Sequence, residues 1–321
     1  MRAWQLTKLG QPPVLSDQSP AMPKAGEVRL CVHACGLNFA DLLMAEGRYQ
    51  DRPALPFVPG LECAGVVEAL GSGVTSPAIG TRVAVYGGHG GLAESGCFQA
   101  DHLVPIPDSM SMVEAAGFLI AYGTSHLALT HKARLQPGET LFVLGAAGGV
   151  GLTAVEIGKR LGARVIASAR GAEKLAVAQA AGADVVIDSE APDLKDRLRG
   201  LGGVDVCYDP VGGAEFDTTL RAMRPEGRML SIGFASGTVP QVPANILLVK
   251  NVSVMGFWWG GYRNFAPALL RDSLAELMSW HADRRLGLHV SHVLPLAQAP
   301  EGLALLRDRA AVGKVVIDCQ A

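Results

Sequence analysis

The sequence lacks an excess of charge of either sign. Its 321 residues include 28 Lys and Arg against 30 Asp and Glu, which gives a formal net charge of -2 at pH 7. Proteins whose main partner is nucleic acid or an anionic membrane surface usually carry a basic field. We therefore expect neither nucleic acid nor a membrane as a partner.

Long apolar runs are also missing. The first twenty residues contain no uninterrupted apolar segment of the kind found in signal peptides. Nowhere do about 18 apolar residues, the length needed to span a bilayer, follow one another without a charge or a proline. The sequence therefore predicts a cytoplasmic protein.

Cysteine is sparse and scattered, and only two of the six residues lie close together in the sequence. Neither a disulfide framework nor a zinc ribbon is indicated, so free thiols are expected. The six are Cys31, Cys35, Cys63, Cys97, Cys207 and Cys319.

Glycine, by contrast, is abundant, with 39 residues that mostly separate short apolar runs. Up to about residue 110, turns recur every eight to twelve residues, which is typical of an antiparallel, barrel-like β region. From Glu139, strands, glycine turns and helices alternate, which predicts a parallel sheet covered by helices on both faces. The fold class is therefore α/β.

Further elements are expected outside these two patterns. A short helix is expected over residues 38–46, and after Gly256 an amphipathic helix over 267–280. A strand near 290–294, a helix over 299–307 and a closing strand KVVID complete the chain.

The strongest motif lies in residues 140–163, TLFVLGAAGGVGLTAVEIGKRLGA. A strand precedes it, an amphipathic helix follows, and Ala146-x-Gly148-x-x-Gly151 has the dinucleotide-binding spacing, with Ala146 in place of the first glycine. Such a loop places helix N–H groups against a pyrophosphate. The loop residues expected to bind it are Ala147, Gly148, Gly149 and Val150.

The end of the second strand indicates which nicotinamide cofactor binds. An acidic side chain there accepts hydrogen bonds from the ribose 2'-hydroxyl of NAD. This sequence has Ser168 and Arg170 instead, with Lys174 one turn later. Because two cations can bind a 2'-phosphate, NADPH is the expected cofactor.

Six segments together resemble the zinc-independent quinone oxidoreductase branch of the medium-chain dehydrogenase/reductase superfamily. They are GLNFADLLMAEGRY (36–49), PFVPGLECAGVVE (56–68), the 140–163 loop, DVCYDPVGG (205–213), SIGFASG (231–237) and KNVSVMGFWWG (250–260). The resemblance implies a discontinuous GroES-like β-barrel catalytic domain, residues 1–121 and 262–321, and a doubly wound parallel-sheet Rossmann domain, 122–261, with the active site between them. It also implies a homodimer formed by edge strands of the Rossmann domains, with residues 249–257 as the candidate segment.

The resemblance also predicts that no metal binds. Alcohol dehydrogenases of this superfamily hold catalytic zinc through a Cys where this sequence has Asn38 and a His where it has Leu61. Neither side chain replaces a thiolate or an imidazole. A structural zinc lobe would need four cysteines near residues 85–105, where only Cys97 occurs.

Without zinc, the expected hydride acceptor changes. An alkoxide needs a strong electrophile, whereas a quinone or an enone gives a delocalised anion that hydrogen-bond donors stabilise. The resemblance assigns Asn38 to the substrate carbonyl or the nicotinamide ribose, Tyr49 to the developing oxyanion, and Asp41 to orienting its neighbours. It adds Thr124, Gly233, Phe234, Phe257 and Arg309 as cofactor contacts, while Asn38 can also serve as a helix cap.

Several functions remain open. The leading one is an NADPH-dependent quinone reductase, and the alternative within enzymes is a reductase of enones or enoyl thioesters such as an enoyl-CoA. A non-catalytic NADPH-binding protein and a zinc alcohol dehydrogenase are further alternatives. Only seven Lys and Arg occur in the first 110 residues, too few for a basic rim around CoA phosphates, which favours small neutral substrates.

Overall fold

The computed structural model describes residues 1–283 and 286–321. Contacts within the chain divide it into two compact units. Unit 1 comprises residues 1–120 and 278–321, and unit 2 comprises residues 121–277. Each unit has its own sheet and core, so each is described by itself.

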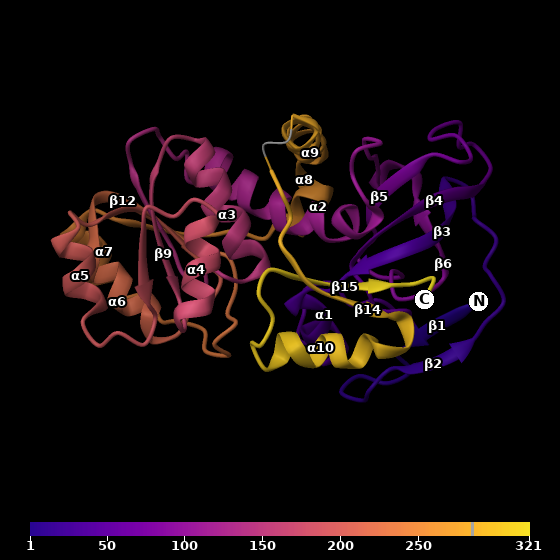
Figure 1. The fold of residues 1–321 in the computed structure, drawn as a ribbon, viewed down its shortest axis with the longest axis horizontal. Coiled ribbons are helices and arrows are strands. Elements are labelled where there is room, and N and C mark those ends of the chain that lie inside the picture. Colours follow the sequence, from indigo (N-terminus) through magenta and orange to yellow (C-terminus); the bar gives the residue numbers. More distant parts are fainter. Residues whose placement is uncertain (284–285) are drawn as a thin grey trace. The chain divides into compact units, whose positions relative to one another are not determined.

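Unit 1 is built mainly of β-strands (Figure 1). Its elements are β1 (Arg2–Gln5), β2 (Val14–Asp17), β3 (Glu27–Gly36), α1 (Phe39–Ala45), β4 (Glu62–Leu70), β5 (Arg82–Tyr86), β6 (Ser95–Gln99), β7 (Leu103–Pro105), β14 (Val290–Pro295), α10 (Ala299–Arg307) and β15 (Lys314–Asp318). A seven-stranded sheet has the order β14-β15-β3-β4-β5-β7, with β6 also paired to β3. The pairs from β3 to β7 are antiparallel, which confirms the prediction for the first 110 residues.

The C-terminal segment completes this sheet. Strand β15 pairs antiparallel with β3, and α10 contributes Leu303 to the same core as Ile317 of β15. In β3, Val28, Leu30 and Val32 are fully buried at alternate positions, the spacing of a strand with one face in a core. The elements predicted over 299–307 and at KVVID therefore occur; β15 joins the sheet of the first region and α10 packs into its core.

Unit 2 is a doubly wound α/β fold with a parallel six-stranded sheet in the order β10-β9-β8-β11-β12-β13. Numbered along the chain this is 3-2-1-4-5-6, the Rossmann order. Figure 1 shows α3 and α4 on one side of the sheet and α6 and α7 on the other. The elements are β8 (Thr140–Val143), α3 (Gly149–Arg160), β9 (Arg164–Ala169), α4 (Ala172–Ala180), β10 (Val185–Asp188), α5 (Leu194–Gly200), β11 (Val204–Asp209), α6 (Ala214–Ala222), β12 (Met223–Ser231), α7 (Ala244–Lys250), β13 (Ser253–Gly256) and α8 (Tyr262–Phe265).

Two long helices, α2 (Met112–Leu127) and α9 (Pro267–Ala282), include the points where the units divide. The structure puts residues 262–277 in unit 2, whereas the sequence-based boundary assigns them to the first domain. One physical reason is a contact of α9: Ser273 on this helix forms a 2.8 Å hydrogen bond with His126 on α2, and both residues belong to unit 2.

Helix α2 and the turn after it, residues 112–132, are long and apolar enough to cross a bilayer by length and composition. However, 78% of the most apolar window is buried inside the protein. Such burial is typical of the core helix of a globular domain, whose apolar faces contact protein rather than lipid.

Candidate functional site

The glycine loop joins β8 to α3 at the centre of the unit 2 sheet. Gly145 has φ of 57°, and Gly148 caps the helix with φ of -82° and ψ of 171°. A Cβ on Gly151 would lie 2.2 Å from the carbonyl oxygen of Gly145, so this position requires glycine for the helix to pack on the strand. A Cβ on Gly148 would meet only that same oxygen, at 3.4 Å. Gly148 therefore leaves open space in front of the helix.

The first turn of α3 is held by buried hydroxyl groups. The Ser125 hydroxyl donates to the carbonyl oxygen of Val150 at 2.9 Å and lies 2.8 Å from that of Thr153 and 3.1 Å from that of Tyr208. Thr153 donates in turn to the carbonyl oxygen of Ala121 at 3.0 Å. Because these bonds connect α3 with α2 and β11, the helix N-terminus is fixed in direction.

This N-terminus lies where the strand order reverses. Strands β9 and β11 flank β8 on opposite sides, and in open α/β sheets ligands bind at such a point, beyond the carboxyl ends of the strands. The first N–H groups of a helix have no acceptor within it and carry the positive end of its dipole. The loop thus fits a pyrophosphate.

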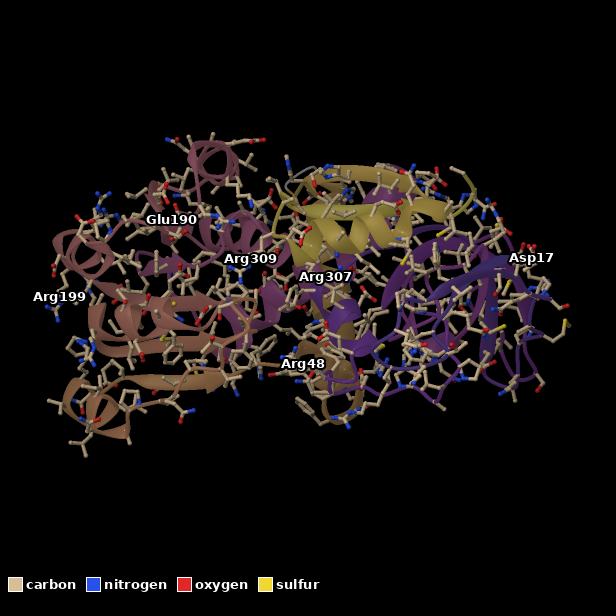
Figure 2. The ribbon with its side chains drawn as sticks, turned by 90° about the horizontal axis from the view of Figure 1, so that it is seen from below. Asp17, Arg48, Glu190, Arg199, Arg307 and Arg309 are labelled. Carbon is tan, nitrogen blue, oxygen red and sulfur yellow. The ribbon has the colours of Figure 1, made fainter. Side chains whose placement is uncertain are left out.

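The end of β9 contains the residues predicted to select the cofactor. Ser168 is fully buried, and among the described residues its hydroxyl has no hydrogen-bond partner. Arg170 is exposed, and its guanidinium lies 3.8 Å from the carboxylate of Glu190, which stands at the surface of unit 2 (Figure 2). Exposed ion pairs contribute little free energy, so the contact with Glu190 holds the Arg170 side chain only weakly. Lys174 lies one turn into α4 and is partly buried.

The remaining predicted cofactor residues of unit 2 lie on neighbouring elements. Gly233 and Phe234 follow β12, and Phe257 follows the adjacent strand β13, where its N–H donates to the carbonyl oxygen of Ser231 at 3.0 Å. Thr124 is buried on α2. The structure thus brings Gly233 and Phe257 together at the carboxyl ends of two neighbouring parallel strands.

Arg309 and the two tryptophans that follow Phe257 have different surroundings. Arg309 belongs to unit 1, where it is exposed just after α10 and has a left-handed backbone with φ of 55°. Trp259 is 4% exposed, and a Cβ on Gly123 would lie 2.7 Å from its ring, so it packs on α2 as a core residue. Trp258 remains 38% exposed.

Asn38 in unit 1 belongs to a buried polar cluster that includes Glu62 and Lys314. The Lys314 ammonium donates to the carbonyl oxygen of Leu37 at 2.8 Å, to Oδ1 of Asn38 at 2.8 Å and to Oε1 of Glu62 at 2.9 Å. The Asn38 amide nitrogen donates to the carbonyl oxygen of Gly36 at 3.1 Å and to the same Glu62 oxygen at 3.0 Å. Lys314 is 3% exposed and Glu62 1% exposed.

Asp41 supports the same region from the first turn of α1. Its carboxylate accepts the backbone N–H groups of Asn38 at 2.8 Å, Leu61 at 3.0 Å and Gly60 at 3.2 Å. Burial raises the pKa of Asp41 to about 7, against the lowering effect of these bonds and of the Lys314 charge. All three of these hydrogen bonds come from backbone N–H groups, so Asp41 orients the backbone around Asn38.

Tyr49 lies in the loop after α1 and is partly buried. Its carbonyl oxygen accepts from the Arg52 guanidinium at 3.4 Å. The structure therefore places Tyr49 in the same unit as Asn38, separated from it in sequence by α1.

At the two positions where the resemblance implies zinc ligands, Asn38 and Leu61, neither side chain is suited to bind a metal ion. Leu61 is 1% exposed and Asn38 is committed to Lys314 and Glu62. In the part of the chain that the structure describes, no three or more His, Cys, Asp or Glu side chains gather where they can hold a metal ion.

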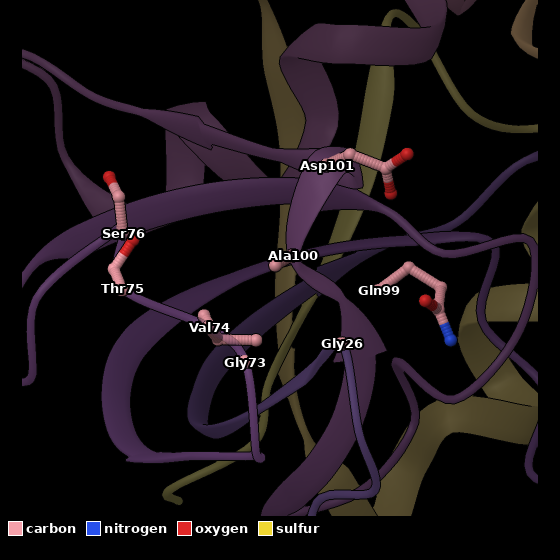
Figure 3. Close-up of a pocket in the computed structure, with 8 residues that line it drawn as sticks. All are labelled: Gly26, Gly73, Val74, Thr75, Ser76, Gln99, Ala100 and Asp101. Carbon is pink, nitrogen blue, oxygen red and sulfur yellow. The ribbon is translucent and has the colours of Figure 1, made fainter.

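A hollow of about 390 Å³ lies on unit 1 near the ends of β3 and β6 (Figure 3). Its lining contains none of the predicted site residues and only short or polar side chains. The lining residues are Gly26, Gly73, Val74, Thr75, Ser76, Gln99, Ala100 and Asp101.

Glu62 and Lys314 were not among the residues predicted from the sequence. A signal for them exists, because each is a charged residue at the first position of a strand, ECAGVVEAL and KVVID, whose next three residues are small or apolar and buried. Charges are almost never fully buried unless they are paired. The pattern thus marks two charges that need partners, but it does not show that they pair with each other.

These features define a two-domain α/β protein with a Rossmann unit and a GroES-like unit. The family model described as "Zinc-binding dehydrogenase" matches residues 149–275, and the one described as "Alcohol dehydrogenase GroES-like domain" matches residues 24–108. The chain is 41% identical to the quinone oxidoreductase-like protein 2 homolog of Nematostella vectensis, over 99% of this chain and 88% of that protein.

Solved structures agree with this relationship. The quinone oxidoreductase of Thermus thermophilus, solved also in complex with NADPH, has a TM-score of 0.88 at 36% identity and covers 99% of this chain and 100% of its own. The Escherichia coli quinone oxidoreductase complexed with NADPH has a TM-score of 0.92 at 30% identity, covering 99% and 100%. The chain belongs to the quinone oxidoreductase-like family of the medium-chain dehydrogenase/reductase superfamily.

Proposed function

We propose that this protein is an NADPH-dependent, zinc-independent reductase that transfers hydride to quinones. The observation that carries the proposal is the end of β9. There Arg170 and Lys174 stand beyond the glycine loop, at the position where NAD-binding relatives of this fold carry an acidic side chain.

Three local features fit the cofactor. The open space at Gly148 accommodates a pyrophosphate against the N-terminus of α3. The buried Ser168 hydroxyl lies at the end of β9, beside the start of the loop, because the carbonyl oxygen of the same residue accepts the N–H of Ala146 at 2.9 Å. Arg170 and Lys174 supply charge for a 2'-phosphate.

When bound, NADPH supplies a hydride that a quinone accepts to give a delocalised oxyanion. The chain's own contribution is to bind, orient and stabilise charge. Tyr49 donates its hydroxyl to the oxyanion, Asn38 contacts the substrate carbonyl or the nicotinamide ribose, and Asp41 holds the backbone of Asn38. The zinc positions carry an amide and a buried leucine, so the stabilisation comes from hydrogen-bond donors instead of a Lewis acid.

The experiment that tests this function follows the loss of NADPH absorbance with the purified protein. The acceptors are 1,4-benzoquinone, 9,10-phenanthrenequinone, an aliphatic enone and crotonyl-CoA, each also run with NADH and with a chelator. We expect chelator-resistant turnover of the quinones with a preference for NADPH. Faster turnover of the enone or the thioester would assign the protein to double-bond reduction, and binding without turnover would indicate a non-catalytic NADPH-binding protein.

We also propose a homodimer formed by strand β13. This strand is an edge of the unit 2 sheet, and β12 is its only partner in the described chain. Before it, Leu248 is 78% and Val249 72% exposed on α7, so an apolar surface adjoins an open strand edge. Light scattering after size exclusion should give twice the chain mass, and Val249→Lys should shift the protein toward monomer; a monomeric wild-type protein would exclude the dimer.

A further inference from the structure

Two carboxylates lie beside the residues that are predicted to bind a 2'-phosphate. Arg170 directly follows β9, while Asp188 ends the neighbouring strand β10 and Glu190 comes two positions later. In the parallel pairing of these strands, Asp188 stands opposite Ala169, the last residue of β9. The carboxyl ends of β9 and β10 therefore bring charges of both signs to the same edge of the unit 2 sheet.

Hydrogen bonds to the backbone fix the spacing of the two turns that follow these strands. The Ser189 N–H donates to the carbonyl oxygen of Ala169 at 3.0 Å. The Asp188 carboxylate accepts one N–H from each turn, that of Gly171 at 3.4 Å and that of Glu190 at 3.0 Å. Asp188 thus connects the turn that carries the cation to the turn that carries the second carboxylate.

That second carboxylate, on Glu190, pairs with Arg170 at the surface of unit 2 (Figure 2). Oε1 of Glu190 lies 3.8 Å from Nη1 of Arg170, and the two side chains are 70% and 55% exposed. An exposed pair of this kind is weak, so a phosphate can displace the carboxylate from the guanidinium at little cost.

Displacement does not remove the charge of Glu190 from the site. A phosphate oxygen bound at about 2.8 Å by the Arg170 guanidinium in its present position lies within about 7 Å of the carboxylate. This separation is shorter than the Debye length of about 8 Å at physiological ionic strength, so salt screens the repulsion only in part.

We propose that Glu190 is a specificity-determining residue that competes with the 2'-phosphate of NADPH for Arg170. This rests on the proposed function, in which Arg170 and Lys174 bind that phosphate. The 2'-hydroxyl of NADH carries no charge, so Glu190 has no anion to compete with when NADH binds. Glu190 therefore weakens the binding of NADPH selectively, and the preference for NADPH is smaller than the two cations alone would give.

The test variant is Glu190→Gln, which removes the charge and keeps a side chain of nearly the same size. Because Glu190 is exposed, the melting temperature should stay that of the wild type. The matched control is Glu226→Gln, which removes an exposed carboxylate of the same unit. Glu226 precedes the residues of β12 that pair along β11, so it lies toward the amino ends of the parallel strands, away from the turns of Arg170 and Glu190.

The first measurement is the Kd for NADPH and for NADH by titration calorimetry. Glu190→Gln should bind NADPH about 3- to 5-fold more tightly than the wild type does, and NADH within about 2-fold of it. The control should match the wild type for both cofactors. An unchanged Kd for NADPH, equal tightening for both cofactors, or weaker binding of NADH would overturn the competition.

The second measurement asks whether the effect is electrostatic and acts through Arg170. Between about 0.1 and 1 M NaCl the Debye length falls from about 10 to about 3 Å, so most of the gain in NADPH affinity should disappear. In the Arg170→Ala background, Glu190→Gln should change the Kd for NADPH by less than about 2-fold, because the phosphate is no longer held beside Glu190. A gain that persists at high salt or without Arg170 would refute the proposal.

Failure of this inference is distinguishable from failure of the proposed function. A Kd for NADPH that rises in the Arg170→Ala/Lys174→Ala variant but does not respond to Glu190→Gln would overturn the role of Glu190 alone. NADPH binding without turnover of any quinone would remove the reductase activity, and the Kd values would still decide the role of Glu190. Equal affinity for NADPH and NADH that the Arg170→Ala/Lys174→Ala variant leaves unchanged would overturn both.

Discussion

Glu156 offers a quantitative test of the unit that holds the glycine loop. It lies on α3, and its carboxylate accepts a hydrogen bond from the Tyr122 hydroxyl on α2. Burial raises the pKa of Glu156 from 4.5 to about 7, and the bond from Tyr122 lowers it less than burial raises it. The folded protein therefore holds a proton on Glu156 at pH values where the unfolded chain has lost it.

The sign of the pH dependence follows from this. Between about pH 4.5 and 7 the folded state binds more protons than the unfolded state, so the free energy of unfolding falls as pH rises through that window. The difference between the two pKa values corresponds to about 3 kcal/mol above pH 7, taken as an upper bound because the side chain is only partly buried.

The perturbation is Glu156→Gln, which keeps an acceptor for Tyr122 and cannot ionise. We expect the variant to unfold like the wild type at pH 5, and to be more stable by up to about 3 kcal/mol at pH 8. Guanidinium unfolding followed by circular dichroism at pH 5, 6, 7 and 8 measures the difference. Comparing the two proteins at each pH isolates Glu156 from Asp41, whose pKa is raised to the same range.

The matched control is Glu173→Gln, an exposed carboxylate on α4 of the same unit. It should change the free energy of unfolding by little at any pH. A stability difference for Glu156→Gln that is the same at pH 5 and pH 8, or that favours the wild type at pH 8, would refute the reasoning.

Three further outcomes are expected. Replacing Arg170 and Lys174 together by Ala should raise the KM for NADPH about 10- to 100-fold and leave that for NADH nearly unchanged in steady-state assays. Gly148→Ala should keep the melting temperature but weaken NADPH binding about 10-fold, whereas Gly151→Ala should cost about 1–3 kcal/mol of stability or more because its Cβ meets backbone. Lys314→Met alone should cost about 3–5 kcal/mol in denaturant unfolding, because its carboxylate partner stays buried.

Two variants serve as controls for this set. Arg199→Ala removes an exposed arginine of the same unit (Figure 2) and should leave the KM for both cofactors unchanged. Gly200→Ala adds a Cβ that meets nothing within 4 Å, so it should melt and bind like the wild type. An equal rise in the KM for NADPH and for NADH when Arg170 and Lys174 are replaced by Ala would mean that a 2'-phosphate binds elsewhere.

The sequence by itself determined the features that depend on neighbouring residues. The strand, glycine turn and helix of residues 140–160 follow from local periodicity and from positions where a Cβ is excluded, as at Gly151. The same local reasoning found α10 and β15. The family resemblance, and not local periodicity, implied that Asn38 and Leu61 occupy positions where zinc needs Cys and His.

Only the tertiary structure decided which distant side chains meet. Lys314 and Glu62 are separated by 252 positions, and they pair because β15 and β4 lie on either side of β3. The contact between Arg170 and Glu190 likewise depends on β9 and β10 lying side by side. Strand order and register are set by the packing of the whole sheet, so a local pattern predicts a buried charge but not its partner. The Asn38 amide contacts both Lys314 and Glu62, so its surroundings also follow from the pairing of these two strands.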